Sequence, residues 1–355
     1  MEGLSFEALR TTWLIALLGL GACVPLTLSF RFCRLGLSLA CVIWAIVFVS
    51  AGLRSEQLNT DTESYVSYVD QTYNTSLSDY VDAQRLEPAW SAMVYVSALV
   101  LDSPRNVLLL CAIATMLLLL VSFRAVGALA PVAMLHYLAE FYLNNDTAIV
   151  RHSFAAALSM AIIVGLQSPA LSGRRLPLSL LVVPPFFHVA SVGILASGFL
   201  AKGSYVRISL AAAALGILAW ILLRTVGATL LPERVLEFDP ENTREIRGFF
   251  HLALLAAVVL IDANALRSAI ERNPKIAFCY LAGVGLSFAV IGFPLLSRVR
   301  QVLLQFGVLF YPLVLARIAR PPRFWLAFVG YAAFITGVAV YTASLLTDKY
   351  NAGFF

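Results

Sequence analysis

Charged residues are scarce in this sequence: they make up 13% of its 355 residues, whereas hydrophobic residues make up 60%. Soluble globular domains carry roughly a quarter charged residues, so the composition excludes that class. Regular alternation of polar and apolar residues is also lacking, as in the run Asn106–Ser122 (NVLLLCAIATMLLLLVS). Because transmembrane barrels depend on such alternation, the sequence predicts an all-α polytopic membrane protein.

Cysteine is rare, and its spacing gives no support for a disulfide framework or a structural zinc site. The cysteines form no CxxC pair, cluster with no histidine, and all lie in or beside apolar segments: Cys23, Cys33, Cys41, Cys111 and Cys279. The sequence also lacks HExxH, P-loop and GxSxG motifs, which removes the signatures of several common enzyme classes.

Long apolar segments predict a bundle of about 11–13 transmembrane helices. The two segments that flank His188 are short and contain Pro184-Pro185, so we expect half-helices there in place of full crossings. The apolar segments cover residues 11–30, 35–53, 105–122, 125–143, 150–167, 176–187, 189–201, 206–223, 248–264, 276–296, 301–318 and 324–346.

The distribution of charge predicts the orientation of these spans. Six short loops hold 13 of the 25 basic residues and, with their flanks, two of the 20 acidic residues. Because cytoplasmic loops are enriched in Lys and Arg, we expect these loops inside and both termini outside. This topology requires that 89–101, which is shorter than the roughly 20 residues of a span, forms a juxtamembrane or re-entrant helix.

A single transmembrane domain, 1–355, then carries two long external segments, 54–104 and 224–247. The first includes Arg54–Pro88 (RSEQLNTDTESYVSYVDQTYNTSLSDYVDAQRLEP), which is polar and rich in Tyr and Asp. Anchoring in a bilayer requires no such segment, and long loops between spans often carry functional residues. We therefore expect the chemistry of the protein at its external face.

Arg54 and Asp61 stand where the second span leaves the bilayer. The planar guanidinium of Arg54 suits phosphate or carboxylate, and Asp61 begins a plausible helix with Tyr65 and Tyr68 near one face. The alternative is a helix cap at Thr60 and Asp61, with Arg54 as an interfacial anchor.

Three further residues have both a functional and a structural interpretation. Glu87 precedes Pro88 at an expected helix start, where an acid also compensates the helix dipole. Arg151 lies outside, against the cytoplasmic bias of basic residues, and is either a ligand-binding residue or an anchor. His188 lies beside the proline break, where it either packs or marks a site.

Arg298 and Arg300 form a second external basic pair. Two or three arginines that converge outside the membrane would make an anion site suited to a diphosphate. A structural role fits the remaining ionisable residues of the spans better: His136, Glu140 and His251.

These motifs follow one another in a characteristic order: Arg54…Asp61-Thr62…Tyr65, then Glu87-Pro88, then Arg151 within I-V-R-H-S-x-A, then Phe187-His188-x-x-Ser191, and finally Arg298 at the end of Gly292-Phe-Pro-Leu-Leu-Ser. The order resembles the EpsG family of bacterial polysaccharide polymerases, of the Wzy (O-antigen or exopolysaccharide polymerase) type, over roughly residues 40–300. Asn59 and His152 depart from the pattern, where a glycine and a glutamine are usual, but neither change removes a charged group.

The resemblance implies a GT-C-like glycosyltransferase whose first periplasmic loop, 54–104, contains juxtamembrane helices. It implies undecaprenyl-diphosphate-linked oligosaccharides as donor and acceptor, in a bacterial inner (cytoplasmic) membrane with the active face periplasmic or extracellular. A chain-length regulator protein is an implied accessory partner. Neither a cofactor, a metal nor nucleic acid is implied, and the sequence has no DxD motif.

In this interpretation Asp61 is the general base or a substrate-orienting carboxylate, and Glu87 is the second choice for the base. The leaving diphosphate needs stabilisation of its charge, which external arginines supply. The predicted substrate-binding residues are Arg54, Thr62, Tyr65, Arg151, His152, Arg298 and Arg300, and His188 lines the site.

Two other functions fit parts of the sequence. A transporter or flippase of lipid-linked oligosaccharide would also use arginines for a diphosphate and broken helices around His188. It would require detectable inverted repeats or acids at the midplane, which the sequence lacks. A membrane O-acyltransferase acting on glycans would need an intramembrane histidine reached from the cytosol, whereas His188 is predicted near the outer face.

Overall fold

The computed structural model describes residues 3–55, 60–84, 87–101, 103–143, 150–167, 176–225, 247–289 and 294–351. These residues form helices joined by short connections, which confirms the all-α prediction. Seven of the described helices are long and apolar enough to cross a membrane, and four shorter apolar helices accompany them. The number of spans and the orientation stay predictions, and most of the second external segment, 224–247, lies outside the described residues.

The described residues divide into two compact units. The first unit takes its residues from Met1–Leu158, Pro184–His188 and Ile335–Phe355, and the second takes them from Ser159–Val183 and Val189–Phe334. The predicted single domain, 1–355, stays a prediction.

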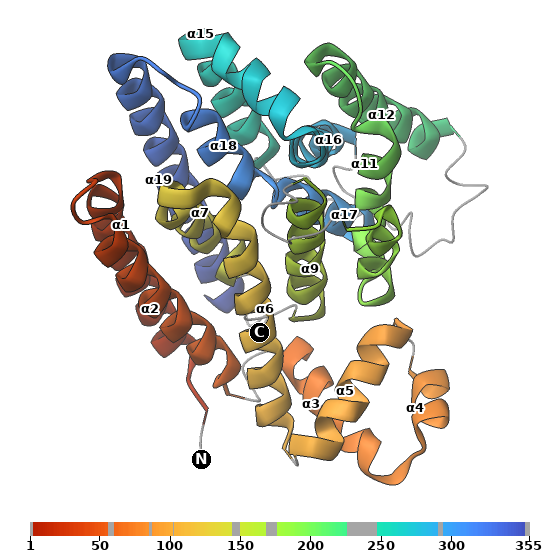
Figure 1. Cartoon of the computed structure of the whole chain (residues 1–355). Helices are drawn as coiled ribbons and strands as arrows, with labels where there is room; N and C mark the ends of the chain where they lie inside the picture. Colours follow the sequence, from red (N-terminus) through yellow and green to blue (C-terminus); the bar gives the residue numbers. More distant parts are fainter. Residues whose placement is uncertain are drawn as a thin grey trace. The chain divides into compact units, whose positions relative to one another are not determined.

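Four helices form the apolar part of the first unit: α1 (Phe6–Leu28), α2 (Cys33–Gly52), α6 (Pro104–Phe123) and α7 (Ala130–Tyr137). α1 packs against α2 and α7, and α2 packs against α6 (Figure 1). These helices are rich in Leu, Ala and Val, which bury easily in a helical bundle and in lipid. α2 ends just before the polar segment begins, so the bundle fixes the position of Arg54, the first candidate residue of that segment.

Aromatic rings and one glycine set the packing at the end of this bundle. The ring of Trp44, which is fully buried, makes edge contacts with the rings of Phe123 and Tyr137 at 5.3 and 5.6 Å between centroids. A Cβ atom on Gly52 would lie 2.7 Å from the Cα of Leu109. Glycine therefore permits the close approach of α2 and α6 just before Arg54.

A sharp backbone turn separates α6 from α7. Gly127, in the connecting segment η2 (Arg124–Leu129), has φ 57° and ψ −124°, a conformation that glycine adopts without steric cost. α7 continues directly into a π-helical turn, η3 (Leu138–Tyr142). The predicted segments 105–122 and 125–143 therefore correspond to α6 and to α7 with η3.

The polar segment after α2 folds into four short helical elements: α3 (Thr60–Asp70), η1 (Gln71–Asn74), α4 (Leu77–Ala83) and α5 (Pro88–Leu101). They are drawn in orange in Figure 1, where they lie at one end of α6. α3 and α5 pack against each other and against α6. The described residues of 54–104 therefore form mainly helices, as expected, and their location outside the membrane stays a prediction.

This helical segment has its own buried core and caps. The Ser76 hydroxyl accepts from the Asp79 backbone N–H at 3.2 Å, a typical N-cap of α4. Tyr80 is buried, and its hydroxyl donates to the Tyr68 carbonyl at 3.0 Å. Burial, with a smaller effect of Tyr68, raises the pKa of Tyr80 to about 12. The segment is therefore a packed structure rather than an open loop.

The predicted break around His188 is confirmed. Between residues 178 and 200 the chain forms four short pieces: η4 (Leu178–Val182), η5 (Pro184–Phe186), η6 (Val189–Ile194) and α11 (Leu195–Leu200). Proline lacks a backbone N–H, so Pro184 and its neighbour interrupt the helical hydrogen bonds. The carbonyl of Pro184 accepts from the backbone N–H of His188 at 3.0 Å, and this turn positions the imidazole in the first unit.

In the second unit, α16 (Pro274–Ala289) is the central helix, and it packs against α12 (Tyr205–Thr225), α15 (Arg247–Arg272), α17 (Pro294–Leu304) and α18 (Gly307–Leu315). Two long helices contribute to both units: α9 (Val150–Gln167) and α19 (Pro321–Asn351).

Candidate functional site

Arg54 links the end of α2 to α3 within the first unit. It is 1% exposed; its Nε donates to Thr62 Oγ1 at 3.0 Å and its Nη1 donates to the Ala51 carbonyl at 2.9 Å. The backbone around it pairs with the N-terminus, where Leu4 forms an isolated β-bridge to Arg54. The predicted ligand residues Arg54 and Thr62 therefore bind each other, and the guanidinium is withdrawn from solvent.

Tyr65 lies one helical turn further along α3 and faces the start of α9. Its hydroxyl lies 3.4 Å from the backbone nitrogen of Arg151, from which it accepts a hydrogen bond. Its ring, which is buried, makes an edge contact with the Trp90 ring at 5.9 Å between centroids. Tyr65 thus joins three elements of the predicted site: α3, α5 and α9.

Glu87, Arg151 and His188 form one cluster, although 64 residues separate the first two in the chain. Glu87 Oε2 accepts from Arg151 Nη1 at 2.7 Å, and Glu87 Oε1 lies 3.6 Å from His188 Nδ1. The side chains of Glu87 and Arg151 are 16% and 17% exposed, whereas that of His188 is 2% exposed. The structure therefore brings together three of the residues that the sequence predicted separately.

The ends of secondary-structure elements hold this cluster. Glu87 directly precedes Pro88, the first residue of α5, and its carbonyl accepts from the Ser91 backbone N–H at 3.0 Å. Arg151 is the second residue of α9, and His188 follows the Pro184 turn. Residues at element ends are held by a rigid scaffold while their side chains stay accessible to a ligand.

His152 is buried beside the same cluster. Its ring and that of His188 meet edge to face, with centroids 5.1 Å apart and an interplanar angle of 81°. The two imidazoles therefore lie next to the Glu87–Arg151 pair. An imidazole can be neutral or cationic, and both forms suit a site for proton transfer or anion binding.

Aromatic rings underlie the cluster. Trp90 is 1% exposed, and its ring lies 6.3 Å from that of Phe154, which lies 5.1 Å from that of Phe187. Phe187 belongs to the motif Phe187-His188-x-x-Ser191 that the sequence analysis identified, whereas no sequence pattern indicated Phe154 as part of the site. Their position depends on the packing of α5, α9 and the Pro184 turn, which sequence spacing does not reveal.

The arrangement combines a partly exposed ion pair with buried imidazoles on an apolar base. An arginine at such a position can exchange its carboxylate partner for a phosphate oxygen, and the carboxylate released in this way can accept a proton. No group of three or more His, Cys, Asp or Glu side chains in the described residues has a geometry suited to a metal ion.

For the remaining predicted residues, Asp61, Arg298 and Arg300, the structure describes no contact with the Glu87–Arg151–His188 cluster. Asp61 is the second residue of α3, but its side chain lies outside what the structure describes, so its role stays a prediction. Arg298 and Arg300 are on α17 in the second unit, and Arg300 is 1% exposed. Their convergence with Arg151 stays a prediction.

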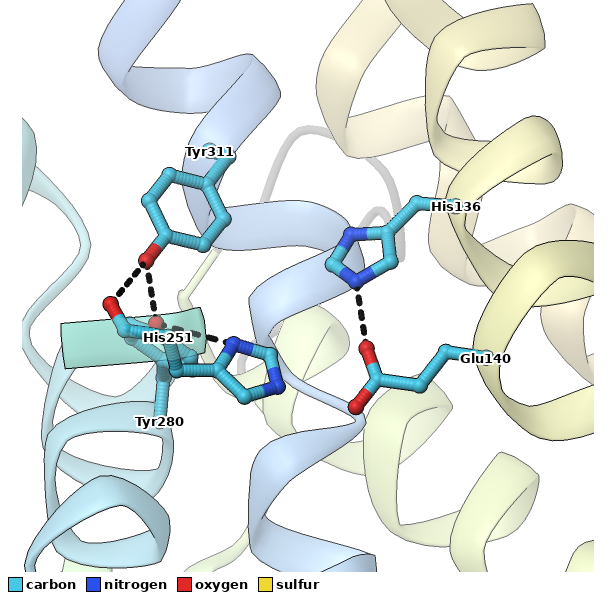
Figure 2. Close-up of polar contacts among 5 residues, drawn as sticks. All are labelled: His136, Glu140, His251, Tyr280 and Tyr311. Atoms are coloured by element: carbon cyan, nitrogen blue, oxygen red, sulfur yellow. Dashed lines mark hydrogen bonds and ion pairs between the residues drawn. The ribbon is translucent and has the colours of Figure 1, made fainter. Parts of the chain in front are cut away.

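The weaker candidates take part in buried polar contacts of their own (Figure 2). In the first unit, His136 Nε2 lies 2.7 Å from Glu140 Oε2, and both side chains are fully buried. In the second unit, the Tyr280 hydroxyl lies 3.2 Å from His251 Nδ1 and also contacts the Tyr311 hydroxyl. Each group pairs with a neighbour inside its own bundle, as expected of structural residues.

Comparison with known proteins identifies the family. Neither the curated proteins nor the solved structures that were searched contain a match. A sequence model of the EpsG family, in contrast, matches residues 37–354, which is nearly the whole chain and includes all the candidate residues above. The chain therefore belongs to the EpsG family, whose members are polymerase-like proteins of the Wzy type.

Proposed function

We propose that this protein polymerises polysaccharide by transferring a glycan from undecaprenyl diphosphate to a lipid-linked repeat unit. The reaction takes place at the external face of the bacterial inner membrane. The family supports a polysaccharide polymerase-like function in general. The choice of donor, acceptor and face rests on the chemistry of the Glu87–Arg151–His188 cluster and on the predicted topology.

The observation that carries the proposal is the ion pair between Glu87 Oε2 and Arg151 Nη1 at 2.7 Å, which is partly exposed. The diphosphate of the donor takes over Arg151, whose guanidinium then stabilises the negative charge that develops on the leaving group. This exchange releases the Glu87 carboxylate for the acceptor.

Transfer then needs one proton acceptor. The acceptor hydroxyl oxygen forms a bond to the anomeric carbon, the bond from that carbon to the diphosphate oxygen breaks, and undecaprenyl diphosphate leaves with the bonding electrons. The hydroxyl proton goes to Glu87, which acts as the general base. His188, 3.6 Å from Glu87, positions the carboxylate. Asp61 is the alternative base or a carboxylate that orients the acceptor.

Polymerisation in vitro tests the proposal. Lipid-linked repeat units that accumulate in cells lacking the gene serve as substrate for the purified protein in liposomes. We expect the wild type to produce a ladder of chain lengths, and Glu87→Gln and Arg151→Ala to produce none. Glu63→Gln, on an exposed position of α3, is the matched control and should retain the ladder. Normal chain lengths from Glu87→Gln or from Arg151→Ala would refute these assignments, and normal chain lengths from Asp61→Ala would exclude Asp61 as the alternative base.

A flippase for lipid-linked oligosaccharide is the second candidate, because the chain breaks into short helical pieces between residues 178 and 200. Transporters build their substrate sites from such discontinuous helices. Translocation of a fluorescent lipid-linked sugar across proteoliposomes, without any change in glycan length, would favour this function over polymerisation.

A further inference from the structure

Three basic side chains lie at one end of the second unit: Lys202, Arg207 and Lys275. Lys202 is in the connection between α11 and α12, and both of these helices pack against α16, whose second residue is Lys275. The Ser197 hydroxyl on α11 contacts the Cys279 thiol, which lies one helical turn after Lys275. This packing places the two lysines, which are far apart in the chain, at the same end of the unit.

A turn at Gly203 brings Arg207 to the same place. Gly203 has φ 99°, a conformation that glycine adopts without steric cost. A Cβ atom on Gly203 would lie 3.0 Å from Arg207 Cδ, so the arginine side chain lies against the residue that follows Lys202. Burial, with a smaller effect of the charge of Lys202, lowers the pKa of Lys275, as expected when two like charges are close.

These three cations differ from a fourth one nearby in that no described carboxylate pairs with them. Arg267 on α15 donates through Nε to Glu271 Oε1 at 3.0 Å, and its guanidinium lies 5.0 Å from the centre of the Tyr205 ring at the start of α12. Lys202 and Arg207 are exposed, and Lys275 is half-buried. Like charges held together repel one another, so an anionic ligand that neutralises them would bind favourably.

Exposed apolar side chains border the three cations and indicate the class of this anion. Phe199, on α11, is 79% exposed, and Val206 and Leu210, on α12, are 45% and 65% exposed. Val206 and Leu210 have the spacing i and i+4, so they lie on one side of α12. A soluble anion makes no use of such apolar contacts. An anionic phospholipid combines a phosphate with acyl chains and therefore matches both parts of this surface.

We propose that Lys202, Arg207 and Lys275 bind the phosphate of an anionic diacyl phospholipid, whose acyl chains lie along Phe199, Val206 and Leu210. The predicted topology places this site in the cytoplasmic leaflet, because the loops that carry these cations belong to the basic set. All of its residues belong to the second unit, and none belongs to the Glu87–Arg151–His188 cluster. The proposal is therefore independent of the proposed polymerisation.

Native mass spectrometry of the purified full chain tests the site by counting bound lipids. The probes are dioleoyl phosphatidylglycerol, dioleoyl phosphatidylcholine with the same acyl chains, and inorganic phosphate without any. We expect the wild type to bind phosphatidylglycerol about tenfold more tightly than phosphatidylcholine. Lys202→Gln and Lys275→Gln should each weaken the binding of phosphatidylglycerol about threefold to tenfold and leave that of phosphatidylcholine unchanged. Lys275→Arg, which keeps the charge, should bind like the wild type.

Arg267→Gln is the matched control, because it removes one positive charge from the same end of the unit, but a charge that Glu271 already pairs. Its affinity for phosphatidylglycerol should stay within about twofold of that of the wild type. An equal loss in Arg267→Gln and in the lysine variants would overturn the site, since net charge alone would then explain the binding. Equal affinity of the wild type for the two phospholipids would also overturn it. Displacement of phosphatidylglycerol by inorganic phosphate would assign the three cations to a soluble anion instead.

Discussion

Replacing Glu87 with glutamine should tighten the binding of undecaprenyl diphosphate while it abolishes glycan transfer. Glu87 and a bound diphosphate compete for the same guanidinium, so the substrate must displace the carboxylate 2.7 Å from Arg151 Nη1. Removal of the negative charge removes this competitor. Glu87→Gln is therefore expected to bind undecaprenyl diphosphate more tightly than the wild type does.

The size of the effect follows from the geometry of the pair. Two unit charges about 4 Å apart attract each other by about 4 kcal/mol at an effective dielectric constant of 20. Both side chains are about one-sixth exposed, and solvent screening and side-chain entropy leave about 1–2 kcal/mol of this attraction. A change of 1.4 kcal/mol is tenfold in affinity, so binding should tighten by about fivefold to thirtyfold.

Titration of bare undecaprenyl diphosphate into nanodiscs that hold wild type, Glu87→Gln or the Glu63→Gln control measures this change. Polymerisation by the same preparations should fall at least about a hundredfold for Glu87→Gln, the usual effect of losing a general base. Weaker or unchanged lipid binding by Glu87→Gln would refute the competition for Arg151.

Three further predictions concern the scaffold around the site. Gly52→Ala should lower the free energy of unfolding by about 1–3 kcal/mol, because its Cβ would lie 2.7 Å from the Cα of Leu109; reversible detergent unfolding measures this, and an unchanged value would contradict the close packing. Thr62→Val should cost about 1.5–3 kcal/mol by removing the acceptor 3.0 Å from Arg54 Nε, and it should leave the affinity for lipid diphosphate within twofold if that contact is structural. Ionisation of Tyr80 should destabilise the α3–α5 segment in alkali. The pKa of Tyr80 is raised from 10.0 to about 12, so its contribution to the stability of the segment is complete below pH 10 and disappears as the pH rises to about 12. Protease sensitivity of the segment should follow this pH range in the wild type and change less in Tyr80→Phe; identical profiles would exclude the effect.

The sequence was sufficient for features that depend on local patterns. Low charge and long apolar runs predicted a helical membrane protein, and the helices of the structure agree with it. Proline chemistry predicted both the break before His188 and the start of α5 after Glu87, because the missing N–H of proline acts within a few residues.

Contacts between residues that are far apart in the chain could not be predicted from such local patterns. The pairing of Glu87 with Arg151 depends on how α5 and α9 pack, and no spacing in the sequence encodes it. The same applies to Arg54, which was predicted to bind a ligand and donates to Thr62 and to the end of α2. Arg300 was predicted as an external basic residue, but its almost complete burial follows only from the fold.

A structure of the protein with bound undecaprenyl diphosphate tests the central claim most directly. The account predicts phosphate oxygens within hydrogen-bond distance of the Arg151 guanidinium, with the Glu87 carboxylate moved away from Nη1 and turned toward the acceptor side. A diphosphate bound elsewhere, with the Glu87–Arg151 pair still at 2.7 Å, would contradict the account.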